Sequence, residues 1–269
     1  MEARLVEFRH VVRRILRKPY LLTRRIFHGP LPSKLSNVEY NRALWDRYAK
    51  EWSKTWVDLE NPDIGEKERD SYVKHLGDEW GRTSHVERIV AEYIYPYITP
   101  ESVVAEIGSG GGRIASRVVE RAKELYCLDI SSEMLKRTHA ALSRYDHVRY
   151  ALLKGPRLPE ELGETLDFIY SFDVFVHLDL HTIWKYFKEI RRCLKSGGRA
   201  FVHTTNLKAP GGWERFAGQE KYSVAGHYYI SPEIVEILAD RSGLRIIKMS
   251  NIDPSNVYLN RDYLVMLEK

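Results

Sequence analysis

From about residue 101 onward, short apolar runs rich in β-branched residues alternate with amphipathic stretches. The apolar runs predict strands at roughly 102–107, 124–129, 147–152, 166–171, 198–204, 244–250 and 262–268. The amphipathic stretches predict helices at roughly 111–122, 132–143, 181–193 and 231–241. This alternation is typical of an α/β domain with a mostly parallel sheet. The last two strands are joined too closely for a parallel crossover, so we expect an antiparallel hairpin there.

The pattern before residue 99 is helical and aromatic. In "NRALWDRYAKEW" the side chains of Leu44, Tyr48 and Trp52 are four residues apart and share one helix face. We therefore expect residues 36–98 to form a helical cap that covers the substrate, and residues 99–269 to form the core domain.

Residues 4–18 predict a separate amphipathic helix that ends before Pro19. Its apolar side is formed by Leu5, Phe8, Val11, Val12, Ile15 and Leu16, and its basic side by Arg9, Arg13, Arg14, Arg17 and Lys18. This pattern fits a helix on an anionic membrane surface, or one that docks on the body of the protein or on a second subunit in a homodimer.

Charge and cysteine content narrow the cellular compartment in which we expect the protein. Residues 1–35 hold nine Lys or Arg and two Glu, so this basic arm accounts for the whole net charge of +5 and the rest is close to neutral. Two cysteines are too few for a disulfide framework and indicate a reducing compartment. No apolar run reaches the length of a membrane span. We expect a cytoplasmic protein, either free or held at the inner face of a membrane by its arm.

The stretch "VVAEIGSGGGR", residues 103–113, places a glycine-rich turn directly after the first predicted strand. Glycines there allow a ligand to approach backbone amides at the start of the next helix. The dinucleotide fingerprint G-x-G-x-x-G is not met, because its last position is Arg113. By itself this loop is weak evidence for a ligand.

Asp129 ends the second predicted strand, where an acid can accept hydrogen bonds from both hydroxyls of a ribose. The alternative is that Asp129 caps the following helix, although Ser131 and Ser132 can already do so. The glycine loop and the acid together predict a nucleoside ligand.

Four motifs in order, "VVAEIGSGGGR", "LYCLDIS", "LDFIYSFDVFVHLD" and "RRCLKSGGRAFVHTT", resemble those of class I S-adenosylmethionine-dependent methyltransferases. The resemblance covers about residues 100–269. It implies a Rossmann-like sheet of seven strands, mostly parallel with the last strand antiparallel, and helices on both faces. "HLGDEWG", "SFDVFVHLD" and "GGWERF" most resemble methyltransferases of polysaccharide and natural-product pathways.

The resemblance also implies a set of residues for the cofactor S-adenosylmethionine. Carried over by motif, these are Glu106, Gly108, Ser109, Gly110, Gly112, Asp129, Ile130, Ser171, Phe172 and Asp173. The glycines would line the methionine and ribose, Glu106 would organise their loop, and Ile130 would pack on adenine. One departure is that Lys154 and Gly155 stand where many relatives carry an acid for the adenine amino group.

The acceptor is narrowed by what the motifs lack. The turn [DNS]-P-P-[YFW] of base-methylating enzymes and the two glutamates of arginine methyltransferases are both missing after the fourth predicted strand. We therefore expect no nucleic-acid substrate and favour O-methylation of a small-molecule or glycan hydroxyl. N- or S-methylation of a small metabolite, or a non-catalytic partner protein that binds the cofactor, remain as alternatives.

An alcohol acceptor needs a base, for which His177, His227 and His203 are the candidates. His177 lies nearest the donor but could merely shape the pocket, and His203 lies within a strand, as core histidines do. Residues 177–181 could also be read as a metal cluster of His177, Asp179 and His181, but we predict no metal site.

The connection at 206–230 is long and predicts a lid-like insertion. Aromatic side chains from this insertion and from the cap could wall the acceptor site; they are Trp45, Tyr48, Trp52, Trp213, Tyr228 and Tyr229.

Overall fold

The computed structural model describes residues 35–52, 75–78, 81–219 and 226–269. The chain divides into two compact units, residues 1–36 and 37–269, and the account below concerns the second. The predicted helix at 4–18, with nearly all of the basic arm, lies outside the described residues. So do residues 53–74 and 79–80 of the predicted cap and residues 220–225 of the predicted insertion.

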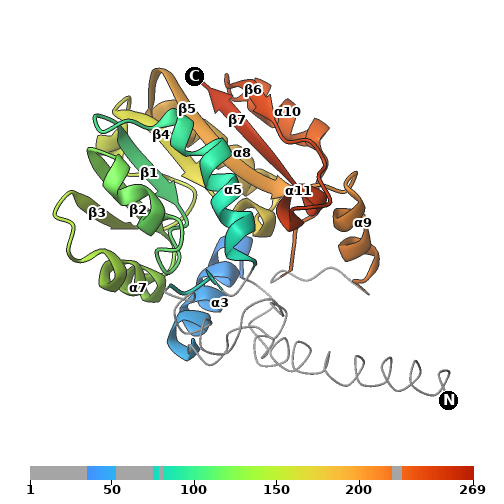
Figure 1. Cartoon of the computed structure of the whole chain (residues 1–269), viewed down its shortest axis with the longest axis horizontal. Coiled ribbons are helices and arrows are strands. Elements are labelled where there is room, and N and C mark those ends of the chain that lie inside the picture. The colour runs from blue at the N-terminus through green and yellow to red at the C-terminus, as the bar shows by residue number, and fades with distance from the viewer. Residues whose placement is uncertain (1–34, 53–74, 79–80, 220–225) are drawn as a thin grey trace. The chain divides into compact units, whose positions relative to one another are not determined.

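The described residues form a sheet of seven strands in the order β3-β2-β1-β4-β5-β7-β6 (Figure 1). The strands are β1 (Val103–Ile107), β2 (Glu124–Asp129), β3 (Val148–Leu152), β4 (Leu166–Ser171), β5 (Leu194–Thr205), β6 (Arg245–Met249) and β7 (Asp262–Glu268). Strand β7 runs antiparallel to both β5 and β6, and the other pairs are parallel. The predicted Rossmann-like sheet and its terminal antiparallel hairpin are confirmed.

Helices flank the sheet and connect its strands. They are α3 (Asn37–Glu51), α5 (Thr83–Tyr93), α6 (Ala115–Val118), α7 (Ser132–Leu142), α8 (Leu180–Cys193), α9 (Pro210–Ala217), α10 (Pro232–Arg241) and α11 (Val257–Arg261). Short 3-10 turns are η3 (Tyr95–Tyr97), η4 (Val119–Arg121), η5 (Glu160–Leu162) and η6 (Phe175–His177). The helix predicted at 111–122 is wrong at its start, because Gly112 has a φ of 88° that a right-handed helix does not permit.

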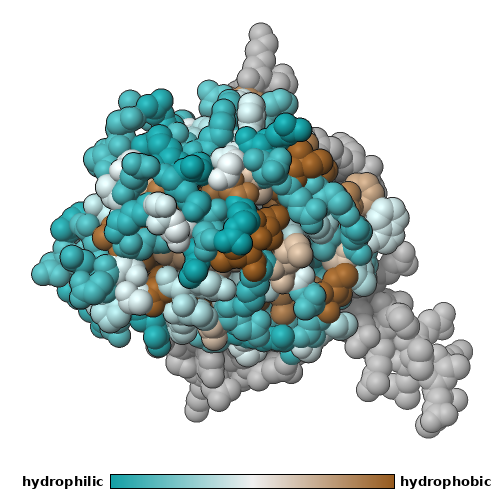
Figure 2. All heavy atoms as spheres, turned by 90° about the horizontal axis from the view of Figure 1, so that it is seen from above, coloured by the Kyte–Doolittle hydropathy of each residue, from teal (hydrophilic) through white to brown (hydrophobic). Residues whose placement is uncertain are grey.

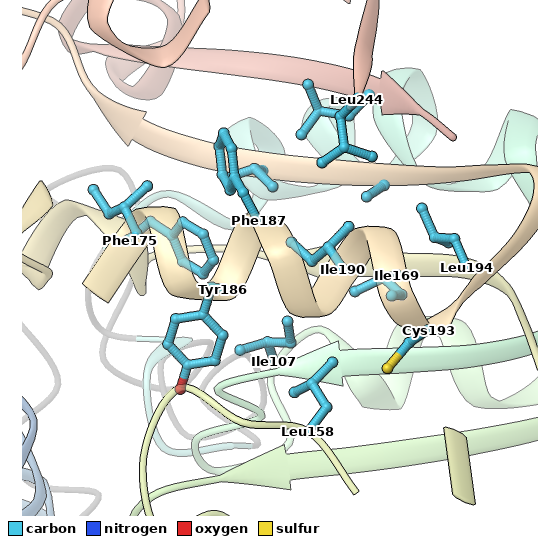
Figure 3. Close-up of a cluster of buried hydrophobic side chains, with 14 of the residues drawn as sticks. Ile107, Leu158, Ile169, Phe175, Tyr186, Phe187, Ile190, Cys193, Leu194 and Leu244 are labelled. Atoms are coloured by element: carbon cyan, nitrogen blue, oxygen red, sulfur yellow. The ribbon is translucent and has the colours of Figure 1, made fainter. Parts of the chain in front are cut away.

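Side-chain alternation along the strands builds one apolar cluster on each face of the sheet. On β5, Val202 packs with α8 and α10, whereas Phe201 packs with α5 on the opposite face. Figure 3 shows the first cluster, in which Phe187 and Ile190 of α8 lie against the strands. The helix α5 crosses the front of the sheet in Figure 1 and buries Val90 completely. This part of the predicted cap therefore belongs to the core.

The helices of the described residues give no sign of a membrane span, since none combines sufficient length with sufficient apolar character. Figure 2 shows one face of the molecule, where hydrophilic residues dominate and hydrophobic ones occur in separate patches.

Candidate functional site

The glycine loop lies where the strand order reverses. From β1 the chain builds outward through β2 and β3 on one side, while β4 pairs with the other edge of β1. In open α/β sheets, ligands bind in the crevice at the carboxyl ends of such strands. The backbone N–H of Gly108 donates to the carbonyl of Leu128 at 2.7 Å, which fixes the loop to the end of β2.

Gly110 has a φ of 55°, and a Cβ added there would meet no atom of the protein within 4 Å. A left-handed backbone explains why glycine is used. The empty volume above it leaves room for a ligand against the backbone.

Asp129 joins this loop to the next helix. Its Oδ2 accepts from the N–H of Gly110 at 2.9 Å, and its Oδ1 accepts from the N–H of Ser131 at 2.8 Å. Burial raises the pKa of the Asp129 carboxyl to about 6, although these backbone hydrogen bonds oppose the rise. Ser131 is the N-cap of α7 and accepts from the Met134 N–H. The alternative reading of Asp129 as the helix cap is therefore not what the structure shows.

Glu106 and Ser109 support the loop from within the protein. The Tyr170 hydroxyl donates to Glu106 Oε2 at 3.1 Å, and burial raises the pKa of this carboxyl well above its ordinary value. The Ser109 hydroxyl lies 3.4 Å from that of Thr138 on α7. Both side chains are buried, so they act on the loop and not on a ligand directly.

Helix α3 contacts the same edge of the sheet through residues that the sequence did not single out. The Arg42 guanidinium donates to the carbonyl of Ile130 at 3.1 Å and to that of Lys154 at 2.7 Å. Asp46 Oδ1 accepts from the Ser131 hydroxyl at 2.6 Å. Arg42 thus ties together the loops after β2 and β3, where the resemblance expects adenine.

A network of hydrogen bonds and ion pairs fixes the backbone at the end of β4. Asp173 has a φ of 57°, which is uncommon for a residue with a side chain. Its N–H donates to His203 Nδ1 at 3.1 Å, and Arg113 Nη1 donates to its Oδ2 at 2.9 Å. Arg113 Nη2 also donates to the Tyr258 hydroxyl at 2.7 Å. These contacts hold the backbone of Asp173 in its unusual conformation.

His203 is fully buried in this network. Because its Nδ1 accepts, its Nε2 carries the proton, and that nitrogen lies 3.0 Å from Asp262 Oδ2. Ser171 and Phe172 also turn inward, since the Ser171 hydroxyl donates to the Ile107 carbonyl and the Phe172 ring lies 4.7 Å from the His203 ring. Among these four side chains, Asp173 is the one that remains partly exposed.

His177 and His227, far apart in sequence, come together with ring centroids 5.2 Å apart. The Trp45 ring also contacts His177, with ring centroids 5.3 Å apart. His177 Nδ1 lies 3.2 Å from the carbonyl of Gly226, and since a carbonyl only accepts, Nδ1 carries the proton and Nε2 presents a lone pair. Burial lowers the pKa of His177 to about 4 and that of His227 well below its ordinary value. Both rings are therefore neutral at physiological pH.

The other predicted aromatic residues are spread more widely. The Tyr229 ring lies 6.0 Å from His227 and borders the histidine pair, whereas Tyr48 packs on Trp45 and is one ring further away. Trp52 lies near Arg137 of α7, Trp213 is 58% exposed, and Tyr228 packs against the interior.

The metal reading of residues 177–181 does not fit the structure. Asp179 is the N-cap of α8 and accepts from the Thr182 N–H at 2.9 Å, while His181 lies exposed within that helix. Among the residues described, no group of His, Cys, Asp and Glu side chains is arranged to hold a metal ion.

Residues 105–202 match a family model whose description is "Methyltransferase domain". No curated protein matches the sequence. The chain carries a class I S-adenosylmethionine-dependent methyltransferase domain. Its cofactor is S-adenosylmethionine.

Solved structures share the fold of this methyltransferase at low identity. Magnesium protoporphyrin IX methyltransferase from Synechocystis PCC 6803, with bound S-adenosyl-L-homocysteine, is 14% identical with a TM-score of 0.61 over 87% of this chain and 100% of its own. Geranyl diphosphate C-methyltransferase from Streptomyces coelicolor A3(2) is 16% identical with a TM-score of 0.61 over 89% of this chain and 99% of its own.

The Gly110→Ala variant of the methyltransferase should bind S-adenosylmethionine at least about tenfold more weakly, because the new methyl group enters the volume that the ligand needs. Gly197→Ala is the matched control, since Gly197 has a φ of 73° and equally open surroundings on β5. Both variants should lose about 1–2 kcal/mol of unfolding free energy from backbone strain. Calorimetric titration should separate them, and equal affinities for the cofactor would contradict the placement.

The Arg113→Met variant should lose about 3–5 kcal/mol of unfolding free energy, because it leaves Asp173 without its buried partner. Arg149→Met removes an exposed pair with Glu124 and should cost less than about 1 kcal/mol. Denaturant unfolding measures both, and similar losses would show that the Arg113 network does not stabilise the fold.

Proposed function

We propose that this methyltransferase transfers the methyl group of S-adenosylmethionine to a hydroxyl oxygen of a small molecule or glycan, with His177 as the base. The observation that carries this proposal is the tautomer of His177. Its Nδ1 proton is directed to the Gly226 carbonyl, and its Nε2 lone pair is therefore free to accept a proton.

Methyl transfer requires the protein to align the acceptor oxygen with the methyl group and to remove the hydroxyl proton. In an in-line displacement the acceptor oxygen bonds to the methyl carbon as the carbon–sulfur bond breaks, and S-adenosyl-L-homocysteine leaves. The hydroxyl proton passes to His177 Nε2 and then to solvent. A positioned base of this kind contributes about 10²–10⁴-fold to the rate. Burial lowers the pKa of His177 to about 4, so the lone pair is available at physiological pH, and the same shift makes this ring a weaker base than a free imidazole.

In this proposal Asp129 receives the ribose hydroxyls and the open volume above Gly110 receives the adjoining part of the cofactor. Ile130 and the backbone near Gly155 border the adenine, where a Cβ on residue 155 would also meet no atom within 4 Å. Asp173, at the carboxyl end of β4, then stands on the side of the donor that faces the histidines.

The position of His177 is fixed by contacts that a base requires. Asn37 and Asn41 of α3 both donate from their side-chain amides to the His177 carbonyl, at 3.0 and 3.3 Å. The Tyr228 N–H donates to the Val176 carbonyl at 2.6 Å, which brings His227 alongside. Helix α3 and the segment after residue 225 thus meet at this turn, and the His177 ring contacts both Trp45 and His227.

The fold by itself does not choose the acceptor atom, because a structure with the same fold is a C-methyltransferase for geranyl diphosphate. A hydroxyl is favoured here because two neutral imidazoles adjoin the site. A neutral amine or a thiolate has much less need of a base. The aromatic rings of Trp45 and Tyr229 suit a sugar or a planar metabolite.

The His177→Ala variant should lower kcat by about 10²–10⁴-fold while its affinity for S-adenosylmethionine stays unchanged. His181→Ala is the control, because His181 is exposed one turn further along. Turnover of a panel of hydroxylated metabolites and glycans is followed through formation of S-adenosyl-L-homocysteine, and the methylated atom is identified by NMR. Unchanged kcat in His177→Ala, or a methyl group on nitrogen or sulfur, would overturn the proposal.

A further inference from the structure

Arg215 is a half-buried cation beside the histidine pair that has no acidic partner among the residues the structure describes. It lies in the last turn of α9, whose Phe216 ring is 5.3 Å from the Tyr229 ring. Tyr229 in turn lies 6.0 Å from His227. This row of rings places α9 against the segment that carries His227.

The charge of Arg215 acts on both histidines. After burial, it is the strongest influence that lowers the pKa of His227, and it also contributes to the lowered pKa of His177. Asp173 is the carboxylate that opposes this lowering of the pKa of His177, and this group is already paired with Arg113 at 2.9 Å. Arg261, which also faces His227, is paired with Asp262 at 2.6 Å.

His227 supplies a second, independent observation. Its side chain is more than nine-tenths buried, and its Nε2 has no hydrogen-bond partner in the described part of the chain. Buried polar atoms are nearly always paired in folded proteins. The unpaired Nε2 of His227, together with the charge of Arg215 that acts on this ring, leaves a polar position that a group of a ligand can fill.

We propose that Arg215 and His227 Nε2 bind an anionic group of the acceptor, either a carboxylate or a phosphate. The guanidinium supplies the charge and several N–H donors, and neutral His227 donates one more hydrogen bond. This inference rests on the proposed function, because it takes the acceptor to lie beside His177.

The arrangement also limits the size of the acceptor's reactive end. The two imidazole rings are 5.2 Å apart, so the hydroxyl that His177 deprotonates and the anion that His227 binds are separated by a few bonds. Hydroxy acids, uronic acids and sugar phosphates have this geometry. A neutral sugar or an isolated phenol lacks the anion and should bind more weakly.

The experiment follows the histidine side-chain NMR signals of the full chain saturated with S-adenosyl-L-homocysteine. Saturation fills the place of the cofactor's own carboxylate, so a further anion reports on the acceptor side. Sodium acetate and sodium phosphate are titrated in separate arms, with sodium chloride at equal ionic strength as the reference. We expect a saturable shift of the His227 signal with acetate, phosphate or both, and the stronger arm identifies the anion class.

In Arg215→Gln this shift should disappear, whereas it should persist in Arg241→Gln, which removes an exposed arginine at the end of α10. A shift that survives Arg215→Gln, or no saturable shift in either arm, would overturn the inference. Because the titration needs no turnover, its failure is separate from a failure of His177 as the base.

With an acceptor in hand, Arg215→Gln should raise KM by roughly 10- to 100-fold with kcat little changed, as the loss of a hydrogen bond to a charged group implies. Arg215→Lys should recover part of that loss. A fall in kcat at constant KM would instead place Arg215 in the chemical step, which contradicts a binding role.

Discussion

The site depends on the Asp129 carboxylate, which accepts one backbone N–H from the glycine loop and one from the start of α7. The loop after β1 and the end of β2 are thereby held in one geometry before any ligand arrives. The carboxylate is buried to do this, and the rise in its pKa to about 6 reflects the free energy that ionisation costs there. A preformed acceptor of this kind loses little entropy when a ribose binds.

Around this centre, the protein uses buried polar contacts to fix loops that apolar packing alone would leave free. Arg42 ties two loops from α3, and Arg113 holds Asp173 in a left-handed conformation. Such contacts are costly to break because each leaves a desolvated partner behind. His227 departs from this pattern, since its Nε2 is left unpaired in the described chain, and the proposal places a ligand there.

The fold was predictable because each of its elements is marked by a pattern within a short run of consecutive residues. The alternation of strands and helices, the glycines after β1 and the acid ending β2 each occupy a few consecutive residues, and the structure confirms the sheet that they imply. The residues that surround His177 and His227 were not predictable, because they come from segments far apart in the sequence. Arg215 is one arginine among many in the sequence, and what distinguishes it is the packing that brings α9 and its charge toward His227, which only the tertiary structure shows. The pairing of His177 with His227 likewise depends on a backbone contact between Val176 and Tyr228.

The central claim is that ionised Asp129 holds the cofactor, and calorimetric titration with S-adenosylmethionine across pH tests it most directly. Ribose hydroxyls donate to the carboxylate, so protonation of a group with a pKa of about 6 in the free protein should weaken binding as the pH falls below that value. The affinity of Asp129→Asn for S-adenosylmethionine should be low and should not depend on pH in this way. Because the ligand's own groups titrate equally with both proteins, the variant also controls for them. Affinity that is equal in the two proteins, or that falls in parallel with pH in both, would contradict the account.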